Sequence, residues 1–361
     1  MKYADEYRDA ALTRPLLEEL QSQKQPMRVM EVCGSHTMAI ARSGLRGLLP
    51  KHIELISGPG CPVCVTAQTH IDTMIALAKL SGVRLAAFGD MFRVPGSQHS
   101  LTTAMAEGGR ATVVYSPMDA LTWAQQNPNE EVVFFAVGFE TTTPGVAATI
   151  LAAEAAGVKN FSVFSTHKTM PAPLHALLQD SELALDGLLC PGHVAAITGA
   201  AVFAEFSEKY HLACCIAGFE TADLLSGLLL LARRISAREF QLDNAYGRAV
   251  SWQGNQRAQR VVAEVFAPVD MLWRGLGMLP QSGLAIRDKY RQFDAEKRFS
   301  VNIPKAQEPP GCRCGDIIRG KIHPPSCPLF GRRCTPANPI GPCMVSGEGA
   351  CAAWHNTVPL S

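Results

Sequence analysis

The chain has 361 residues, of which 47% are hydrophobic and 18% charged, and its formal net charge is +1. This composition supports sizeable buried cores and argues against long disordered segments. The balance of 33 basic and 32 acidic residues lacks the basic surface typical of nucleic-acid or anionic-membrane binding. The charged N-terminus is unlike a signal peptide, and apolar runs such as Leu224–Ala232 are far shorter than the ~20 residues that span a bilayer. We therefore expect a cytoplasmic protein that binds neither nucleic acid nor membrane.

The first two-thirds of the chain alternates between short apolar runs and helical segments. Helices are predicted, for example, at Thr69–Leu80, Val146–Ala156 and Thr221–Arg234. Strands separated by helices predict βαβ units and mostly parallel sheets. The predicted strands are 28–32, 53–57, 84–88, 112–115, 132–137, 161–164, 187–189 and 212–217.

A polar break at Asn127-Pro128-Asn129 indicates a domain boundary. We expect an α/β domain at 1–128 and a second at 129–240. Regular alternation ends near Gln241, so 241–361 is predicted to contain a helical connector and a C-terminal Cys-rich domain. The predicted fold class is therefore α/β, with two Rossmann-like parallel-sheet domains and a small Cys-rich iron–sulfur domain.

Cysteine usage is the most informative feature of the composition. Six of the 12 cysteines fall in the last fifty residues, and three more lie between Cys33 and Cys64. A secreted disulfide scaffold would be shorter, with cysteines spread along its length. Clustered cysteines in a cytoplasmic chain indicate metal or redox chemistry.

The C-terminal cysteines lie in a segment rich in glycine and proline that has too few apolar residues to bury a core alone. An iron–sulfur cluster needs four convergent thiolates, and turn-rich backbone allows such convergence. Structural zinc usually shows paired CxxC or CxxC/HxxxH sequences, which are not present here. Unliganded thiols are the third alternative. Two cysteines exceed the four ligands and suit a redox-active disulfide; the six are Cys312, Cys314, Cys327, Cys334, Cys343 and Cys351.

Two further cysteine motifs follow predicted strands. Gly58-Pro59-Gly60-Cys61-Pro62-Val63-Cys64 places both thiols at the start of a helix, where the helix dipole favours the thiolate. This spacing suits a reversible disulfide or two ligands to one metal. In Cys33-Gly34-Ser35-His36-Thr37, the Cys and His can share a metal, or the His can deprotonate a nucleophilic Cys33. Buried, unreactive side chains are the plain alternative for both motifs.

Other strand ends carry weaker signals. Cys190-Pro191-Gly192-His193 can line a cleft, although packing also explains Cys190. Cys214 and Cys215 lie within an apolar strand and are expected in the core. Gly-Phe-Glu-Thr occurs at 138–141 and again at 218–221, after a strand each time. Such sheet edges bind ligands in α/β proteins, while an acid capping the next helix is an equally good explanation.

Together these motifs resemble the HypD family of [NiFe]-hydrogenase maturation factors. The resemblance covers nearly the whole chain and rests on several long, unusual motifs in one order. They are CGSHT at 33–37, GPGCPVC at 58–64, GFETTTP at 138–144, PGHVAAITG at 191–199 and CRCG…CPLFGRRCTPANPIGPCMVSGEGAC at 312–351.

The resemblance implies an assembly scaffold with a redox role rather than a turnover enzyme. Proteins of this family work with the chaperone HypC to hold iron while carbonyl and cyanide are attached. Cyanide comes from HypE, which is loaded through HypF, and the Fe(CN)2(CO) unit passes to the hydrogenase large subunit. On this sequence, Cys33 is the implied iron ligand, tuned by His36, and Cys61 and Cys64 form a thiol pair or help to hold iron. From position alone, Asp90 or Glu140 could hydrogen-bond cyanide nitrogen or protonate an intermediate, and His193 receives no role.

The family's C-terminal domain is similar to ferredoxin–thioredoxin reductase, which has a [4Fe-4S] cluster beside a reactive disulfide. That analogy implies a redox pair of Cys314 and Cys343, although spacing alone leaves either of them open as a ligand. An iron–sulfur thiol-disulfide oxidoreductase and a zinc-stabilised interaction protein are the alternative functions. The implied cluster ligands are Cys312, Cys327, Cys334 and Cys351.

Overall fold

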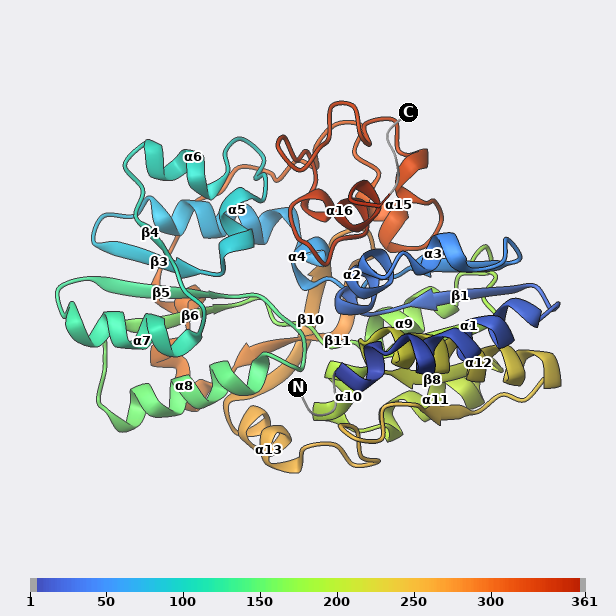
Figure 1. The fold of residues 1–361 in the computed structure, drawn as a ribbon. Helices are drawn as coiled ribbons and strands as arrows, with labels where there is room; N and C mark the ends of the chain where they lie inside the picture. Colours follow the sequence, from blue (N-terminus) through green and yellow to red (C-terminus); the bar gives the residue numbers. More distant parts are fainter. Residues whose placement is uncertain (1–4, 358–361) are drawn as a thin grey trace.

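The computed structural model describes residues 5–357 and shows two parallel sheets, with a Cys-rich region packed against them (Figure 1). This confirms the predicted α/β class, and all eight predicted strands are present. The first sheet has the order β2-β1-β7-β8-β9 and the second the order β4-β3-β5-β6. The strands are β1 (Met27–Glu31), β2 (Ile53–Ser57), β3 (Val83–Ala87), β4 (Ala111–Val113), β5 (Glu131–Ala136), β6 (Phe161–Ser165), β7 (Gly187–Pro191), β8 (Ala213–Ala217) and β9 (Leu242–Asn244).

The expected boundary at residue 128 does not coincide with the division between the sheets. β3 and β4 precede it, yet they share a sheet with β5 and β6, which follow it. β1 and β2 pair instead with the later strand β7. The break at residues 127–129 is only the loop between α7 (Pro117–Gln126) and β5. The chain therefore starts the first sheet, builds the whole second sheet, and returns to finish the first.

Helices cover both sheets, as the βαβ pattern predicts. α1 and α12 pack on one face of the first sheet, whereas α7, α8 and α13 cover one face of the second. Local capping supports their ends: Ser116 and Asp119 form a capping box at α7, and Glu220 and Asp223 form one at α12. Other helices are α1 (Ala10–Ser22), α2 (Gly34–Arg42), α3 (Leu45–Leu48), α4 (Pro62–Val65), α5 (Gln68–Ala78), α6 (Leu101–Ala106), α8 (Thr143–Ala155), α9 (Pro171–Leu178), α10 (Gly192–Thr198), α11 (Ala201–Tyr210), α12 (Thr221–Ala237) and α13 (Gln256–Val265).

The predicted helical connector contains an antiparallel hairpin. Strands β10 (Phe266–Trp273) and β11 (Gly277–Ile286) follow α13 and lie between the two sheets (Figure 1). Isolated bridges tie Trp273 to Thr66 and Gly283 to Lys168. The hairpin thus contacts parts of the chain that are far apart in sequence. The short helix α14 (Ala295–Arg298) follows it.

The Cys-rich region contributes to a shared core and does not form one alone. Its helices α15 (Cys314–Ile318) and α16 (Ala350–His355) are short, and turns make up most of the rest. Ile317, Ile318 and Met344 join the central hydrophobic cluster that also contains residues from both sheets. Within residues 5–357, no helix has the length and apolar character needed to cross a bilayer.

Candidate functional site

The ends of β1 and β2 bring the two N-terminal cysteine motifs together. The strands run parallel with Glu31 opposite Ser57, so the loops that follow leave the sheet side by side. The Gly34 amide donates to the Gly60 carbonyl over 2.9 Å. A Cβ on Gly60 would lie 2.3 Å from the Cys33 amide nitrogen. Only glycine permits this approach, which places Cys33 beside the start of the Cys61–Cys64 turn.

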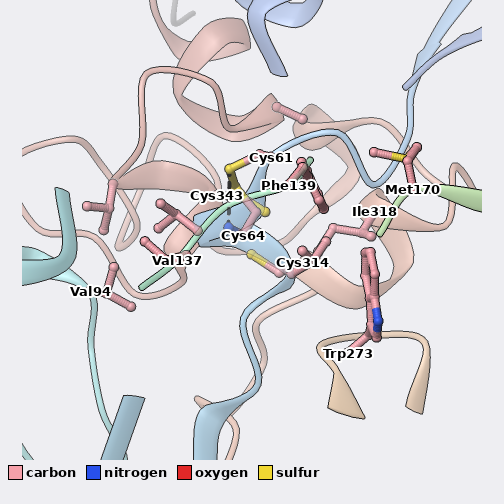
Figure 2. Packing of buried hydrophobic residues seen from close by; sticks show 14 of the residues in the cluster. Cys61, Cys64, Val94, Val137, Phe139, Met170, Trp273, Cys314, Ile318 and Cys343 are labelled. Atoms are coloured by element: carbon pink, nitrogen blue, oxygen red, sulfur yellow. Dashed lines mark hydrogen bonds between the residues drawn. A yellow bond between two sulfur atoms is a disulfide. The ribbon is translucent and has the colours of Figure 1, made fainter. Parts of the chain in front are cut away.

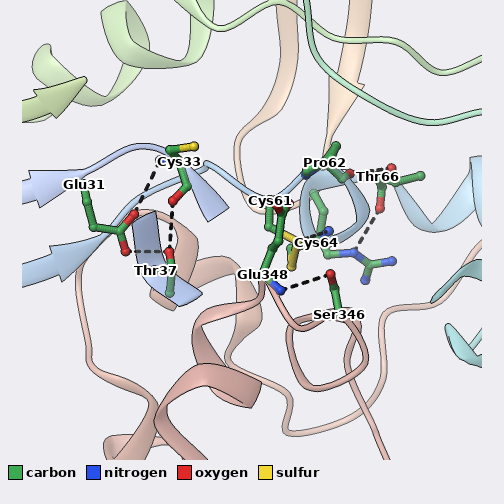
Figure 3. The surroundings of a disulfide bond; sticks show 10 residues. Glu31, Cys33, Thr37, Cys61, Pro62, Cys64, Thr66, Ser346 and Glu348 are labelled. Atoms are coloured by element: carbon green, nitrogen blue, oxygen red, sulfur yellow. Dashed lines mark hydrogen bonds between the residues drawn. A yellow bond between two sulfur atoms is a disulfide. The ribbon is translucent and has the colours of Figure 1, made fainter. Parts of the chain in front are cut away.

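Cys61 and Cys64 form a disulfide at the start of α4 (Figure 3). Cys61 is the N-cap residue of this single helical turn, and its sulfur accepts a hydrogen bond from the Cys64 amide at 3.2 Å. Pro62 occupies the first helical position, which suits its fixed φ and missing N–H. Both cysteines are buried, so the oxidised pair is shielded from bulk solvent.

Cys33 is a buried free thiol at the N-cap of α2. Burial, and next the charge of Glu348, raise the pKa of this thiol to about 12. The backbone N–H groups of His36 and Ser35 act in the opposite direction. The thiol form of Cys33 is therefore favoured at neutral pH, and a nearby cation would offset the cost of the buried thiolate charge.

Glu31 supports the backbone around Cys33. Its buried carboxyl accepts a hydrogen bond from Thr37 Oγ1 at 2.6 Å and one from the Cys33 amide at 3.4 Å (Figure 3). Burial raises the pKa of Glu31 to about 7. Sequence reasoning missed this residue, although an acid at the end of an apolar strand was a usable signal.

His36 lies near Cys33 in sequence, but its ring serves another strand. Its Nε2 lies 3.1 Å from the Ala217 carbonyl and 3.0 Å from that of Gly218, at the end of β8. Because only a protonated Nε2 can donate to these acceptors, it is the N–H nitrogen of the ring. Burial lowers the pKa of His36 to about 4. The group of His36 that faces the Cys33 thiol is thus its backbone N–H.

A cavity of about 130 Å³ opens in front of Cys33 and collects residues from several motifs. Phe139, Thr141 and Thr142 come from the first Gly-Phe-Glu-Thr motif, and Pro191 and His193 come from the end of β7. The Cys-rich region adds Glu348. Ser35 Oγ donates to Glu348 at 2.7 Å and lies 3.4 Å from His193 Nδ1.

This cavity shares Ser35 and His193 with a larger groove of about 650 Å³. The groove is lined on its outer side by Arg8, Arg42 and Glu220. His193 stacks on Phe219 with ring centroids 3.8 Å apart. The Cys33 cavity and this groove therefore adjoin at Ser35 and His193. Sequence reasoning gave no role to Ser35 or Glu348, because their meeting depends on tertiary packing.

The acidic residues at the ends of other strands, Asp90, Glu140 and Glu220, differ in burial and in their hydrogen-bond partners. Glu140 accepts a hydrogen bond from the Met170 amide at 2.9 Å, and burial raises the pKa of its carboxyl to about 7. Its second oxygen is buried without a partner. Asp90 is exposed, and its charge contributes to the raised pKa of Glu348. In the second repeat, Glu220 caps α12, so the capping explanation holds there.

The C-terminal cysteines surround a second, small cavity. Five of the six line it together with Ile317, Leu329, Phe330 and Met344. A Cβ on Gly341 would lie 2.6 Å from Cys312 Sγ and 2.7 Å from Cys314 Sγ, so the absent side chain leaves room for both sulfurs. The Ile340 amide donates to Cys334 Sγ at 3.4 Å. The five cysteines are Cys312, Cys314, Cys327, Cys334 and Cys351.

The donor set of this cavity is made of thiols, which bind iron or zinc. Within residues 5–357, no three His, Cys, Asp or Glu side chains converge as ligands to one metal ion. An iron–sulfur cube takes one thiolate on each iron atom, so five thiols around one cavity exceed by one the number it needs. Cys314, expected in the redox pair, lies on the cavity with the four expected ligands, whereas Cys343 does not line it.

Cys343 lies between the two sulfur sites. Its 3₁₀ turn Pro342–Met344 contacts α4, which carries Cys64. Figure 2 shows Cys343, Cys314 and the Cys61–Cys64 disulfide in one buried cluster. The thiols of Cys314 and Cys351 are close enough to Cys343 to affect its pKa. The remaining cysteines, Cys190, Cys214 and Cys215, are buried in β7 and β8.

Comparison with known proteins matches this sequence to one family. The model described as "HypD: Hydrogenase formation hypA family" matches residues 10–357. The chain is 46% identical over 365 residues to the hydrogenase maturation factor HypD of Azotobacter vinelandii, covering 98% of this chain and 96% of the relative. It is 43% identical over 364 residues to the HypD of Escherichia coli K12, covering 98% of each. This chain belongs to the HypD family of hydrogenase maturation factors.

In this HypD chain, the five motifs of the sequence lie around two adjoining centres. CGSHT, GFETTTP and PGHV contribute to the Cys33 cavity, and the GEGAC portion of the last motif supplies Glu348. GPGCPVC joins the cavity through Gly60 and Pro62 and carries the disulfide. The Cys-rich region thus serves both centres.

Proposed function

We propose that this HypD protein is a cytoplasmic scaffold that holds an iron atom at Cys33 while cyanide and carbonyl are attached to it. The observation that carries the proposal is the Cys33 cavity, where one thiol lines a small hollow beside a disulfide and a carboxyl group. A thiolate is a soft donor suited to iron that carries strong-field ligands. One protein ligand also leaves most coordination positions to the diatomic groups and to a partner.

The chemistry of the cavity supports a role in receiving such cargo. Loading iron requires the Cys33 proton to leave, and the nearby Glu348 carboxylate, hydrogen-bonded to Ser35, is placed to accept it. Ser35 also lies beside His193, which reaches the surface groove. The hydroxyl of Thr141 can donate a hydrogen bond to cyanide nitrogen, whereas that of Thr142 donates to the Phe139 carbonyl at 3.2 Å.

Cys33 is the single ligand that this chain offers to the proposed iron, so other proteins must supply the remaining ligands. We assign the groove beside Ser35 and His193 to the approach of HypC, whose N-terminal cysteine would share the iron with Cys33. HypE, loaded through HypF, would be the cyanide donor, and the finished unit would pass to the hydrogenase large subunit. The groove is several times larger than the inner cavity, which leaves room for a polypeptide segment outside and only the iron unit inside.

We further propose that the C-terminal cavity holds a [4Fe-4S] cluster through Cys312, Cys327, Cys334 and Cys351. Such a cluster supplies single electrons at low potential. Cys314 competes with Cys312 for one position, because both sulfurs face Gly341. Cys343 and the Cys61–Cys64 pair, which lie next to each other, would carry reducing equivalents toward Cys33 by thiol–disulfide exchange.

Infrared spectroscopy tests the scaffold role. Protein co-purified with HypC from cells that express the maturation proteins should show cyanide and carbonyl stretching bands, and Cys33→Ser should lose them while retaining HypC. Cys190→Ser, a buried cysteine that does not line the cavity, is the matched control and should keep both bands. Bands that persist in Cys33→Ser would refute the assignment of Cys33.

An iron–sulfur thiol-disulfide oxidoreductase is the second candidate function, favoured by the Cys61–Cys64 disulfide. It predicts turnover of a dithiol substrate with no infrared bands, and it leaves the Cys33 cavity without a task. The same preparation therefore distinguishes the two functions.

A further inference from the structure

The Cys61–Cys64 disulfide lies on a helix of only four residues, Pro62–Val65. Its internal hydrogen bonds are few, such as the one from the Val65 amide to the Cys61 carbonyl at 3.2 Å, and its last carbonyls need partners from elsewhere. Thr66 is the C-cap residue of this turn and has extended backbone, so its carbonyl takes no part in the helix. Contacts that stabilise the C-terminal end of this turn therefore also limit the movement of Cys61 and Cys64.

The tip of the β10–β11 hairpin supplies these partners. The Arg274 amide donates to the Val65 carbonyl at 2.9 Å. Arg274 Nε donates to the Thr66 carbonyl at 3.1 Å, and Nη2 donates to Gln68 Oε1 at 2.8 Å. The side chain of Arg274 is 2% exposed and forms an ion pair with Glu308, from the segment that leads to Cys312. One buried guanidinium thus holds the end of α4 and the connector together.

Neighbouring residues fix the hairpin tip itself. Trp273 pairs with Thr66 as an isolated bridge and stacks on Phe139, which lines the Cys33 cavity. Figure 2 shows Trp273 in the same buried cluster as Cys64 and Cys314. Gly275 lies against Gly315, where an added Cβ would come within 2.7 Å of the Gly315 Cα. The tip is therefore wedged between α4 and α15.

We propose that Arg274 is a positioning residue that caps the end of the Cys61–Cys64 turn and so sets how readily this pair closes into its disulfide. The inference rests on the proposed function, which uses Cys61 and Cys64 as a redox pair. In the oxidised state the sulfur–sulfur bond itself closes the turn. In the dithiol state hydrogen bonds alone hold it. Some lie within the turn, such as the one from the Thr66 hydroxyl to the Pro62 carbonyl at 2.8 Å, and the Arg274 guanidinium adds those to Thr66 and Gln68. Replacing the Arg274 side chain removes the guanidinium bonds and leaves the backbone bond from its amide to Val65.

This asymmetry gives the direction of the effect. Losing the cap frees the dithiol form more than the disulfide form, which lowers the effective concentration of one thiol at the other. The disulfide should then be easier to reduce. A cation near the pair has the opposite effect, because it favours thiolates, so its loss would make reduction harder. The direction in which the reduction equilibrium shifts therefore distinguishes a positioning role of Arg274 from an effect of its positive charge.

The experiment equilibrates the full-length protein, without iron or HypC, in mixtures of reduced and oxidised dithiothreitol. In each exchange the reagent gives up two electrons and two protons, closing its own disulfide, and the Cys61–Cys64 bond opens to two thiols. Alkylation and peptide mass spectrometry then give the fraction of the pair that is reduced. Circular dichroism confirms that each variant is folded.

Arg274→Gln and Arg274→Lys should both shift the equilibrium constant toward the dithiol by about threefold or more. Lysine retains the charge but lacks the rigid fork that reaches Thr66, Gln68 and Glu308 together. Arg298→Gln is the matched control, because Arg298 also bonds a backbone carbonyl and a carboxylate but does so on the second sheet. It should leave the constant unchanged.

Wild-type values for Arg274→Gln, or for Arg274→Lys alone, would overturn the positioning role. If both variants fail to fold, Gln68→Leu decides: it removes one acceptor of the guanidinium and should shift the constant in the same direction by a smaller factor. A wild-type pair that resists reduction at all reagent ratios would refute the redox use of Cys61 and Cys64. A wild-type pair that cycles normally beside unchanged variants would refute only the role of Arg274.

Discussion

Glu348 and Cys33 come from opposite ends of the chain, and the charge of the Glu348 carboxylate adds to the raised pKa of the Cys33 thiol. Gly34 permits the approach, since a Cβ there would lie 2.6 Å from the Cβ of Glu348. Glu348 also has a raised pKa, caused mainly by burial. The two groups line one small cavity and influence each other's protonation. Glu348 is therefore placed to accept the thiol proton if Cys33 binds a cation.

Glu348→Gln tests this coupling in the metal-free protein. Removing the negative charge should lower the pKa of Cys33, although burial will keep it above its usual value. We expect the rate of Cys33 alkylation at pH 9 to rise by about threefold, measured peptide by peptide with mass spectrometry. Glu154→Gln, exposed on α8, is the control. An unchanged or slower rate in Glu348→Gln would show that the carboxylate does not act on Cys33.

The pH dependence of stability should report on Lys168. This lysine is 1% exposed, its Nζ has no hydrogen-bond partner, and burial lowers its pKa to about 7. Between pH 7 and 10.5 the unfolded chain binds the proton and the folded chain does not, so the free energy of unfolding rises with pH across this window. The destabilisation is complete below pH 7, where both states are charged.

Lys168→Met should therefore stabilise the protein by about 2–4 kcal/mol near pH 7. The gain should shrink as pH rises toward 10, because the wild-type lysine then costs less. Urea unfolding at pH 7, 8 and 9 measures both trends. Lys159→Met, at an exposed position, should change neither. A gain that stayed constant with pH would indicate a packing effect in place of a charge effect.

Local patterns predicted the strands and the three cysteine motifs well, because each depends on a short stretch of sequence. The pairing of β1 with β7 was beyond reach, since nothing in either strand records which partner lies beside it. The hairpin was missed for a related reason. Pro268 and Asp270 interrupt its apolar pattern, and it is stabilised by contacts with both sheets.

The candidate site shows the same division. Cys33, Cys61 and Cys64 were predicted together because neighbouring parallel strands end at one edge. His36 was expected to act on Cys33 from its spacing, but packing directs its ring to the carbonyls of β8. Glu348 reaches the cavity only because the Cys-rich region packs on α2, a tertiary contact with no signature in the motif itself.

Gly60 should be the glycine of the site least tolerant of substitution. Gly60→Ala would place a Cβ 2.3 Å from the Cys33 amide nitrogen, and backbone on both sides of the contact leaves little room to relax. We expect a loss of about 2–3 kcal/mol in the free energy of unfolding, measured with urea. Gly47→Ala is the matched control. It lies in α3 with nothing within 4 Å of the added Cβ, and should be neutral or slightly stabilising. Equal effects at the two positions would refute the close approach.

A variant of Cys343 should distinguish the proposed cluster from the proposed thiol pathway, because it should affect only the second. Because it does not line the C-terminal cavity, Cys343→Ser should retain the visible sulfide-to-iron absorption and the iron content of anaerobically reconstituted protein. Cys327→Ser, on the cavity wall, should lose both. Cys343→Ser should nevertheless slow reduction of the Cys61–Cys64 disulfide by dithionite-reduced protein by about tenfold or more, since it removes the thiol beside α4. Loss of the cluster in Cys343→Ser would show that Cys343 is a ligand, and an unchanged reduction rate would show that it is not part of the thiol pathway.

The variants Cys312→Ser and Cys314→Ser identify the fourth ligand, because the absorption is lost only when the true ligand is replaced.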